Sequence, residues 1–384
     1  MLDAAAPDDV AIIQYLTHIR LGFGALDALA EDLDALGVAR PLVVSDRGIE
    51  AAGLLAQLTA ALPNPPGAVF LETPPNPSEA AARAAAELYR AQGCDGVVAF
   101  GGGSSIDLAK AVAVLAGQGG DLADYVLIRG GAGKISEAIA PLVAIPTTAG
   151  TGSEVGRAAL ITFEGGRKMA LVSPHLIPKR AICDPGLLLG VPAGLTAATG
   201  MDALAHCVET YLSPKINPPA DAIALDGAGR LARWLEAAVS DGSNRRARWE
   251  TMTASLQGGL TFQKGLGAVH GLSHALGGYG EARLHHGLLN ALLLPPVLRH
   301  NAGAAPEKEA ALRHAMGLAP DADLAEAFAD LNRRLGIAER LAPGSVDPGD
   351  VEAIAAYAME DHSTATNPRP MTAAAYAEML WSIL

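Results

Sequence analysis

Potential metal ligands occur as two pairs with helical spacing in the second half of the chain. Asp202 and His206 are four residues apart, and so are His270 and His274. Positions i and i+4 lie on one face of an α-helix, with Cβ atoms roughly 5–6 Å apart, so each pair can point at a single spot. Another histidine, His286, follows in Arg-Leu-His-His-Gly. Three imidazoles and a carboxylate suit a borderline divalent cation such as Fe²⁺ or Zn²⁺.

A glycine-rich loop offers a second kind of site. The run Phe100-Gly-Gly-Gly-Ser-Ser-Ile-Asp-Leu-Ala-Lys110 follows an apolar segment typical of a strand and opens a helical pattern. Glycines let the backbone approach a ligand, and a helix N-terminus presents free N–H groups and a positive dipole end, so we expect a pyrophosphate here. The alternative is a tight turn with Ser104 or Ser105 as the helix N-cap. Neither GxGxxG nor a Walker loop occurs in the chain, so a nucleotide site here is not a standard Rossmann site.

Two further segments follow expected strands and carry polar side chains. Asp46 ends the first strand, where a carboxylate can bind the ribose hydroxyls of NAD and repel the 2′-phosphate of NADP. Taken alone, Asp46 is equally well explained as a negative charge at the N-terminus of the next helix. The run from Thr147 to Glu154 has hydroxyls and glycines that suit a polar ligand, although such clusters are usually plain loops.

Short apolar runs alternate with alanine-rich helical stretches through the first half of the chain. Such alternation predicts an α/β domain with a largely parallel sheet. The expected strands are Pro41–Ser45, Ala68–Glu72, Gly96–Phe100, Pro141–Ile145, Ala159–Phe163, Lys168–Val172 and Ala181–Asp184, and the expected helices are Ile49–Leu62, Ser78–Gln92 and Ser104–Ala116. From about Leu195 onward only helical periodicity remains. We therefore predict an α/β dinucleotide-binding domain over residues 1–185 and an all-helical metal and substrate domain over residues 186–384.

The composition restricts the partners and the compartment. A formal net charge of −13 argues against nucleic acid and anionic membranes, since both reward clustered lysine and arginine. No apolar run reaches the length of about 18 residues that suggests a spanning helix, and the start of the chain lacks the basic residues of a signal peptide. Three scattered cysteines make no disulfide framework. We therefore expect a cytoplasmic protein with a small-molecule substrate.

Together, these motifs resemble those of the iron-containing, group III alcohol dehydrogenases. The matching segments are GGGSSIDLAK at 101–110, PTTAGTGSEV at 146–155, CDPGLLLGVP at 183–192, GLTAATGMDALAHCVE at 194–209, and GAVHGLSHALG with HHGLLNALLLP across 267–295. They follow the order and spacing of the family and cover nearly the whole chain. The resemblance implies an architecture shared with dehydroquinate synthase, an active site in the cleft between two domains, and a homodimer or larger homo-oligomer.

The family pattern also assigns roles to single residues. It implies that the metal ligands are Asp202, His206, His270 and His286, and that His274 lies near the reacting centre outside the metal's ligands. The implied cofactor contacts are Asp46, Asn76, Gly102, Gly103, Ser104, Thr147, Thr148, Thr151 and Lys168. The cofactors are then NAD and Fe²⁺, and ligand type alone does not exclude Zn²⁺.

The segment between His274 and His286 departs from the common family pattern. It is somewhat longer, and His285 stands beside His286, so that either could be the ligand. We favour His286, because it directly precedes Gly287 as the ligand of the family does. We expect His285 to be a solvent-facing loop residue.

Two segments indicate a substrate class within the family. The opening run from Gln14 to Gly24 and the segment Phe262–Gly267 resemble the bacterial 4-hydroxybutyrate dehydrogenases. A substrate with a carboxylate would need a fixed cation in the cleft. Arg157 and Arg283 are candidates by position.

We therefore predict a metal-dependent oxidoreductase that transfers a hydride between NAD(H) and a primary alcohol or aldehyde, with 4-hydroxybutyrate and succinic semialdehyde as the candidate pair. His274 would pass the proton outward, because histidine titrates near neutral pH. One alternative is reduction of maleylacetate by a related branch, against which the intact Asp202 and His206 count. Another is a lyase like dehydroquinate synthase, which would need more Lys and Arg in the cleft motifs.

Overall fold

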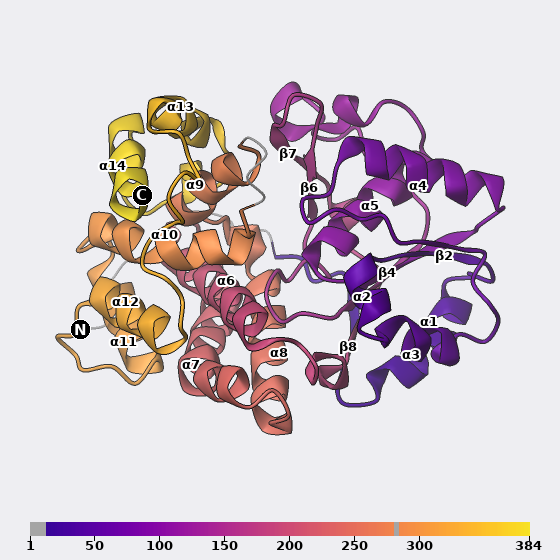
Figure 1. Ribbon diagram of the computed structural model, residues 1–384, viewed down its shortest axis with the longest axis horizontal. Helices are drawn as coiled ribbons and strands as arrows, with labels where there is room; N and C mark the ends of the chain where they lie inside the picture. The colour runs from indigo at the N-terminus through magenta and orange to yellow at the C-terminus, as the bar shows by residue number, and fades with distance from the viewer. Residues whose placement is uncertain (1–12, 280–283) are drawn as a thin grey trace.

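Two halves of different architecture lie side by side in the computed structural model, which describes residues 13–279 and 284–384 (Figure 1). The first half of the chain, indigo to magenta in the figure, forms a sheet with helices around it, and the rest is helical. This confirms the predicted fold class. The last strand of the sheet ends at Cys183, and the first long helix of the second half begins at Ala193. The predicted division at residue 185 lies between them and stays a prediction.

Six parallel strands form the main sheet, in the order β1-β8-β5-β4-β2-β3. They are β1 (His18–Leu21), β2 (Pro41–Val44), β3 (Ala68–Phe70), β4 (Gly96–Gly101), β5 (Leu142–Pro146) and β8 (Arg180–Cys183). Gly101 pairs with Pro146 at the carboxyl ends of β4 and β5. This register brings the glycine-rich loop beside the loop from Thr147 to Glu154, the threonine-rich loop. A separate antiparallel hairpin consists of β6 (Ala158–Thr162) and β7 (Lys168–Val172).

Helices cover both faces of the main sheet. They are α1 (Leu29–Ala35), α2 (Arg47–Ala51), α3 (Leu54–Ala61), α4 (Glu79–Ala91) and α5 (Gly103–Gly117). Successive residues of a strand point to opposite faces. Val97 therefore packs in one apolar core with residues of α4 and α5, whereas Val98 packs in another with residues of α1 and α3. Burial on both faces explains why these strands read as continuous apolar runs.

The helical half is built around α6. Its helices are α6 (Ala193–Leu212), α7 (Pro218–Ser240), α8 (Arg245–Leu260), α9 (Ala268–Gly277), α10 (His286–Asn301), α11 (Pro306–Ala315), α12 (Leu324–Arg334), α13 (Val351–Glu360) and α14 (Ala373–Ile383). Every residue from 196 to 212 is buried, and α7, α8 and α10 pack against α6. A helix enclosed on all sides can hold polar side chains away from water. Among the described residues, no helix combines the length and the apolar character needed to cross a membrane.

Candidate metal and cofactor site

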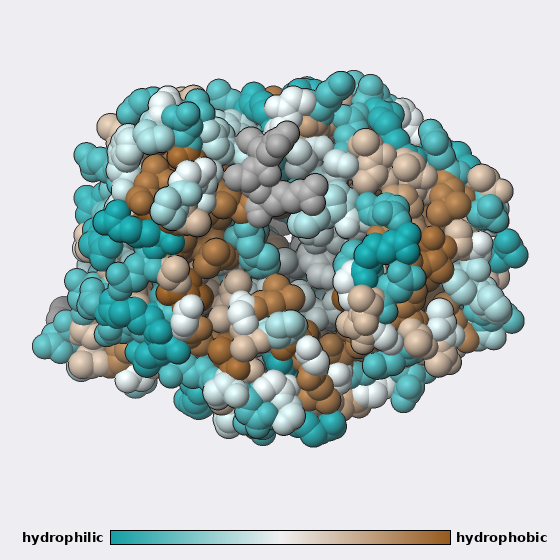
Figure 2. Space-filling view, viewed as in Figure 1, coloured by the Kyte–Doolittle hydropathy of each residue, from teal (hydrophilic) through white to brown (hydrophobic). Residues whose placement is uncertain are grey.

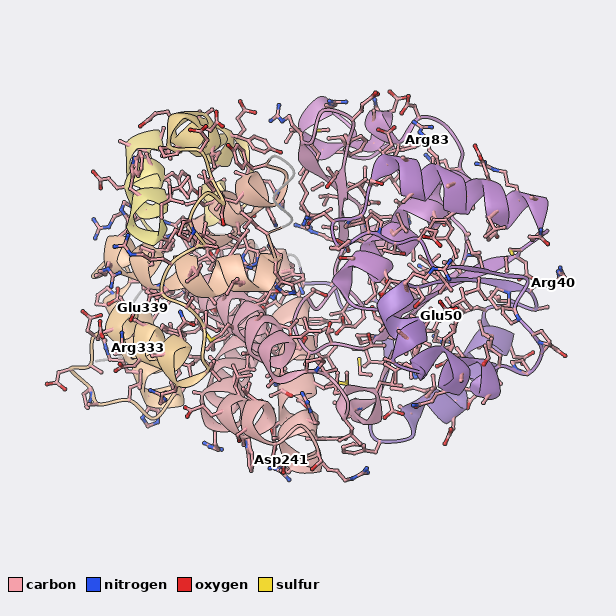
Figure 3. The ribbon with its side chains drawn as sticks, viewed as in Figure 1. Arg40, Glu50, Arg83, Asp241, Arg333 and Glu339 are labelled. Atoms are coloured by element: carbon pink, nitrogen blue, oxygen red, sulfur yellow. The ribbon has the colours of Figure 1, made fainter. Side chains whose placement is uncertain are left out.

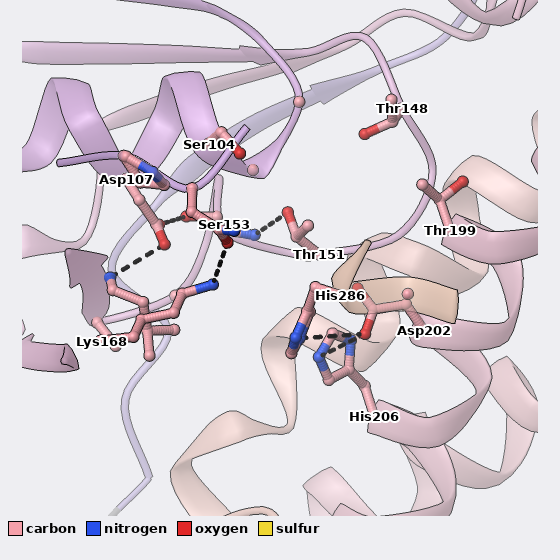
Figure 4. Close-up of a pocket in the computed structure, with 18 of the residues that line it drawn as sticks. Ser104, Asp107, Thr148, Thr151, Ser153, Lys168, Thr199, Asp202, His206 and His286 are labelled. Atoms are coloured by element: carbon pink, nitrogen blue, oxygen red, sulfur yellow. Dashed lines mark hydrogen bonds and ion pairs between the residues drawn. The ribbon is translucent and has the colours of Figure 1, made fainter. Parts of the chain in front are cut away.

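A cleft of about 1780 Å³ lies between the two halves and is lined by side chains from both. The face of the molecule in Figure 2 is hollowed there. Figure 4 shows Ser104, Thr151 and Lys168 of the α/β half across from Asp202 and His206 of the helical half. Residues predicted from distant motifs are thus brought to one cavity.

Three of the predicted ligands, all histidines, converge on one carboxylate oxygen of the fourth, Asp202. Asp202, His206 and His270 are buried and bring one potential ligand atom each to within 4.8 Å of one another. Oδ1 of Asp202 lies 3.6 Å from Nε2 of His206, 3.7 Å from Nε2 of His270 and 3.6 Å from Nε2 of His286. These separations are too long for hydrogen bonds. Donor atoms around a tetrahedral ion with bonds near 2.1 Å lie about 3.4 Å apart, so the four side chains fit a metal ion.

The two neighbouring histidines at the start of α10 lie in different surroundings. His286 is the first residue of the helix and faces Asp202. His285 is the exposed N-cap, and its Nδ1 accepts a hydrogen bond from the backbone N–H of Leu288 at 3.4 Å. The structure thus places His286, and not His285, with the other potential ligands. His274 lies beside this group, with its ring stacked on that of His286 at a centroid distance of 5.5 Å.

Acceptors hold the Nδ1 atoms of two of the predicted ligands, His270 and His206. Nδ1 of His270 contacts the carboxylate of Glu209, which also accepts the backbone N–H of Val269 at 2.7 Å. Nδ1 of His206 lies 3.2 Å from the carbonyl oxygen of Gly150. An N–H donated from Nδ1 fixes the tautomer and leaves the Nε2 lone pair for a metal.

Three polar residues of this site were not predicted from the sequence: Glu209, Asn290 and Asp361. Asp361 holds His274, since its Oδ2 lies 3.0 Å from Nδ1 of that histidine. Asn290 lies at the centre of the ligand group. Helical spacing could have indicated two of them, because Glu209 is three residues after His206 and Asn290 is four residues after His286. No local pattern points to Asp361.

Burial and the carboxylate of Asp202 shift the pKa values of the predicted metal ligands. Burial lowers the pKa of His206 to about 4 and that of His286 well below its usual range, although Asp202 opposes both shifts. Burial also lowers the pKa of His270, but Glu209 and Asp202 outweigh it and raise that pKa to about 9. Burial raises the pKa of Asp202, but the surrounding imidazoles hold it well below its usual range. At neutral pH, His206 and His286 are therefore neutral beside an ionised Asp202, whereas His270 holds a proton that it would release when a cation binds.

The glycines of the cofactor loop allow two loops to approach each other closely. Gly102 is the N-cap of α5 and Gly103 its first residue. A Cβ on Gly103 would overlap the side chain of Thr151, and a Cβ on Gly102 would lie 3.4 Å from Oγ1 of Thr148. Ser104 donates its hydroxyl to the carbonyl of Pro75. The start of α5, where backbone N–H groups lack partners within the helix, thus lines the cleft, as a phosphate site requires.

Other predicted cofactor residues line the same cleft. Nζ of Lys168 lies 3.2 Å from Oδ1 of Asn76, and burial lowers the pKa of this lysine. Asp46 caps α2, since its Oδ1 accepts the backbone N–H groups of Gly48 at 2.8 Å and Ile49 at 3.0 Å. The capping contacts agree with the interpretation of Asp46 as a negative charge at the N-terminus of α2. Because Asp46 also lines the cleft, the structure is equally compatible with the predicted contact to NAD. Thr147 lines the cleft as well, with a buried hydroxyl that has no partner among the described residues.

Two sequence families match the chain, one in each half. Residues 17–185 match "Iron-containing alcohol dehydrogenase", and residues 196–384 match "Fe-containing alcohol dehydrogenase family, C-terminal". The chain belongs to the iron-containing alcohol dehydrogenase family.

Relatives of known activity or structure are similar over nearly the whole chain. A 4-hydroxybutyrate dehydrogenase of Cupriavidus necator is 51% identical over 378 residues, which cover 97% of this chain and 99% of the relative. A crystal structure of 1,3-propanediol oxidoreductase matches with a TM-score of 0.86 at 35% identity, over 97% of this chain and 100% of that one. Sulfoacetaldehyde reductase from Bifidobacterium kashiwanohense, solved in complex with NAD⁺, matches with a TM-score of 0.87 at 29% identity, over 98% and 99%.

These matches confirm the predicted family, reaction class and cofactors. The protein is an oxidoreductase of alcohols that depends on NAD and on the metal ion of its family, iron. Asp202, His206 and His270 form a buried group able to hold that ion.

Proposed function

We propose that this enzyme interconverts 4-hydroxybutyrate and succinic semialdehyde, with NAD(H) as the hydride carrier. The identity of 51% to the Cupriavidus necator relative supports this substrate pair. The structural observation that carries the proposal is Arg157, a cation that lines the cleft between the two halves. An ω-hydroxy acid differs from a plain alcohol by a carboxylate, and a guanidinium is well suited to bind one.

Arg157 is available to a ligand. Its side chain is exposed, and it forms no ion pair with any residue in 13–279 or 284–384. Arg83 and Arg333 on the outer surface, labelled in Figure 3, pair instead with carboxylates. An unpaired cation inside the cleft of a protein with a net charge of −13 is a local seat for an anion. Arg283, the other predicted candidate, lies outside the described residues.

Arg157 lines the same cleft as His274 and His362. The ring of His362 stacks on that of His274 at a centroid distance of 6.1 Å. A short hydroxy acid could therefore place its carboxylate at Arg157 and its hydroxyl at the metal centre.

The roles that we propose at the metal centre follow from the geometry. Asp202, His206, His270 and His286 would hold the ion, through the four atoms that converge near Oδ1 of Asp202. When bound, the metal supplies Lewis acidity toward the substrate oxygen and NAD⁺ supplies the hydride acceptor. His274 would exchange the hydroxyl proton through Nε2, because Asp361 holds its Nδ1 and fixes the ring.

The residues that we propose for NAD share a position on the α/β side of the cleft. They are Asp46, Asn76, Gly102, Gly103, Ser104, Thr147, Thr148, Thr151 and Lys168. The glycines and Ser104 would receive the pyrophosphate at the start of α5. Lys168, held by Asn76, would stay close to the cofactor and away from bulk water.

Substitution of Arg157 tests the substrate. In Arg157→Gln, kcat/KM for 4-hydroxybutyrate should fall by roughly 10–150-fold, the loss of a charge-assisted contact of about 1.5–3 kcal/mol. The value for 1-butanol should stay within about threefold, since a neutral alcohol makes no such contact. Arg333→Gln, on the outer surface, is the matched control and should change neither value. Equal turnover of the acid and of 1-butanol by the wild type, with iron and NAD⁺ supplied, would contradict the hydroxy-acid proposal.

We also propose that the enzyme works as a homo-oligomer in the cytoplasm. Three buried free cysteines, Cys94, Cys183 and Cys207, support a reducing compartment. The family resemblance supports the assembly. Light scattering on the purified protein measures the oligomeric state. A monomer at micromolar concentration would contradict the proposed homo-oligomer.

A further inference from the structure

Asn290 is a fully buried amide at the centre of the proposed ligand group. It lies one turn after His286 on α10 and has no solvent exposure. Its Nδ2 lies 2.6 Å from Oδ1 of Asp202 and 3.1 Å from Nε2 of both His270 and His286. Asn290 thus contacts three of the four proposed ligands through the atoms that would face the ion.

Only one of these three contacts is compatible with a bound metal. An amide nitrogen has two hydrogens, so it cannot serve three acceptors at once. The Nε2 lone pair of an imidazole cannot accept a hydrogen bond and also bind a cation. A carboxylate oxygen has more than one lone pair and can do both. The short contact to Asp202 is also the charge-assisted one, and therefore the strongest.

Packing alone does not explain an asparagine at this position. Oδ1 of Asn290 has no partner among the described residues. A buried polar atom without a partner costs roughly 1–3 kcal/mol. The neighbours Leu289 and Leu293 on α10 are buried in the apolar core, and a leucine of similar volume would avoid that cost at Asn290.

We propose that Asn290 is a positioning residue of the metal centre. Its Nδ2 donates to Oδ1 of Asp202, which holds the carboxylate toward the three histidines and thereby sets the affinity for Fe²⁺. The inference rests on the ligand set proposed above. It does not depend on which alcohol the enzyme oxidises.

Two variants of Asn290 test the inference through metal binding. Asn290→Leu keeps the volume and removes the donor, and Asn290→Ala removes the donor with most of the side chain. The dissociation constant for Fe²⁺ is measured anaerobically by competition with a chelator, together with the thermal midpoint of the metal-free protein. Both variants should bind Fe²⁺ about 10–100-fold more weakly, as expected when a partner of a metal ligand is lost. The metal-free Asn290→Leu protein should keep a cooperative unfolding transition.

Controls separate this inference from its premises. Leu293→Ala, on the same buried helix, should lower the thermal midpoint but change the affinity by less than about threefold. His270→Ala should lose the metal altogether. If His270→Ala retains iron, the proposed ligand set is wrong. If His270→Ala loses iron while both Asn290 variants bind it within about twofold of the wild type, the role of Asn290 is overturned and the ligand set stands. If Leu293→Ala binds Fe²⁺ as weakly as Asn290→Leu does, the effect of the Asn290 variants comes from packing alone, and the proposal is also overturned.

Discussion

Glu154 is a buried carboxyl group that follows Ser153, a residue of the cleft lining. It is 2% exposed, and its Oε2 has no partner among the described residues. Burial raises its pKa to about 7, and its own backbone N–H and the charge of Lys110 oppose the shift only in part. Nζ of Lys110 is itself held by Ser153 and by two carbonyl oxygens, at 2.7–2.9 Å. Because Lys110 donates to these three partners, its ammonium group does not form a direct ion pair with Glu154.

This burial predicts how the free energy of unfolding changes with pH. The pKa of Glu154 in the folded state lies above its ordinary value of 4.5, so the native state binds the proton more tightly than the unfolded state does. The contribution to stability is complete below about pH 4.5 and is lost as pH rises toward 7. The pKa shift corresponds to a loss on the order of 3 kcal/mol. Between about pH 5 and 7.5, the free energy of unfolding of the wild type should therefore fall relative to that of Glu154→Gln, measured by urea unfolding of the metal-free proteins. Glu164→Gln, at an exposed site, should follow the wild type at every pH. A difference between the wild type and Glu154→Gln that does not change with pH would contradict the argument.

Residues of this site were predictable where their geometry is local. Asp202 and His206 share one helix face, so their spacing alone indicated a common target, and the structure brings them together. Glu209 lies on the same helix and could have been found in the same way. Asp361 could not, because its partner His274 is 87 residues away and only the packing of α13 against α9 joins them.

At the scale of elements, α2 shows how a helix cap and a proposed cofactor contact can share one residue. Oδ1 of Asp46 caps α2, while Oδ2 accepts the hydroxyl of Ser105 at 3.3 Å. Arg47 beside it is paired with Glu72 and Glu50. The nearest cation is therefore already occupied by acids, which leaves the negative charge of Asp46 to repel a 2′-phosphate.

Two substitutions separate the cap from the charge. Asp46→Ser keeps a good helix cap and removes the charge, whereas Asp46→Ala removes both. Each should improve kcat/KM for NADP relative to NAD by roughly 1–3 kcal/mol. Only Asp46→Ala should also lose about 1 kcal/mol of unfolding free energy. Steady-state kinetics with both cofactors and urea unfolding check the two effects. A ratio of NAD to NADP efficiency that does not change in either variant would place Asp46 outside the cofactor site.

Elements were predictable from sequence where burial follows a simple pattern. The buried strands read as apolar runs, and all seven expected strands are present within a residue or two. β1 (His18–Leu21) was missed, because its residues are exposed or half-buried and only pairing with β8 defines it. The expected helix Ile49–Leu62 is divided into α2 and α3, because Gly53 has a φ of 74° that a continuous helix does not allow. An alanine-rich stretch around a single glycine does not reveal that break.

At the scale of the whole molecule, the sites that we propose for the metal ion and for NAD lie in different halves. The proposed metal ligands come from α6, α9 and α10, which belong to one apolar core. The proposed NAD contacts come from the sheet side of the cleft. One contact joins the two sites directly, since Nδ1 of His206 lies 3.2 Å from the carbonyl of Gly150 in the threonine-rich loop. Through this contact, the carbonyl group of Gly150 links a proposed metal ligand to the threonine-rich loop.

This division predicts distinct patterns of hydrogen exchange for the two ligands. Iron added to the metal-free protein should slow exchange in α6, α9 and the first turn of α10, because a bound ion disfavours openings that separate its ligands. NAD⁺ should slow exchange around residues 101–105 and at the start of α5. Residues 147–151 should respond to both ligands, because they contact the proposed cofactor site and also hold His206. α12, which contributes no ligand, should respond least and serves as the internal control. Uniform slowing of both halves by iron alone would show that the molecule opens as one unit, and would contradict a metal site confined to the helical half.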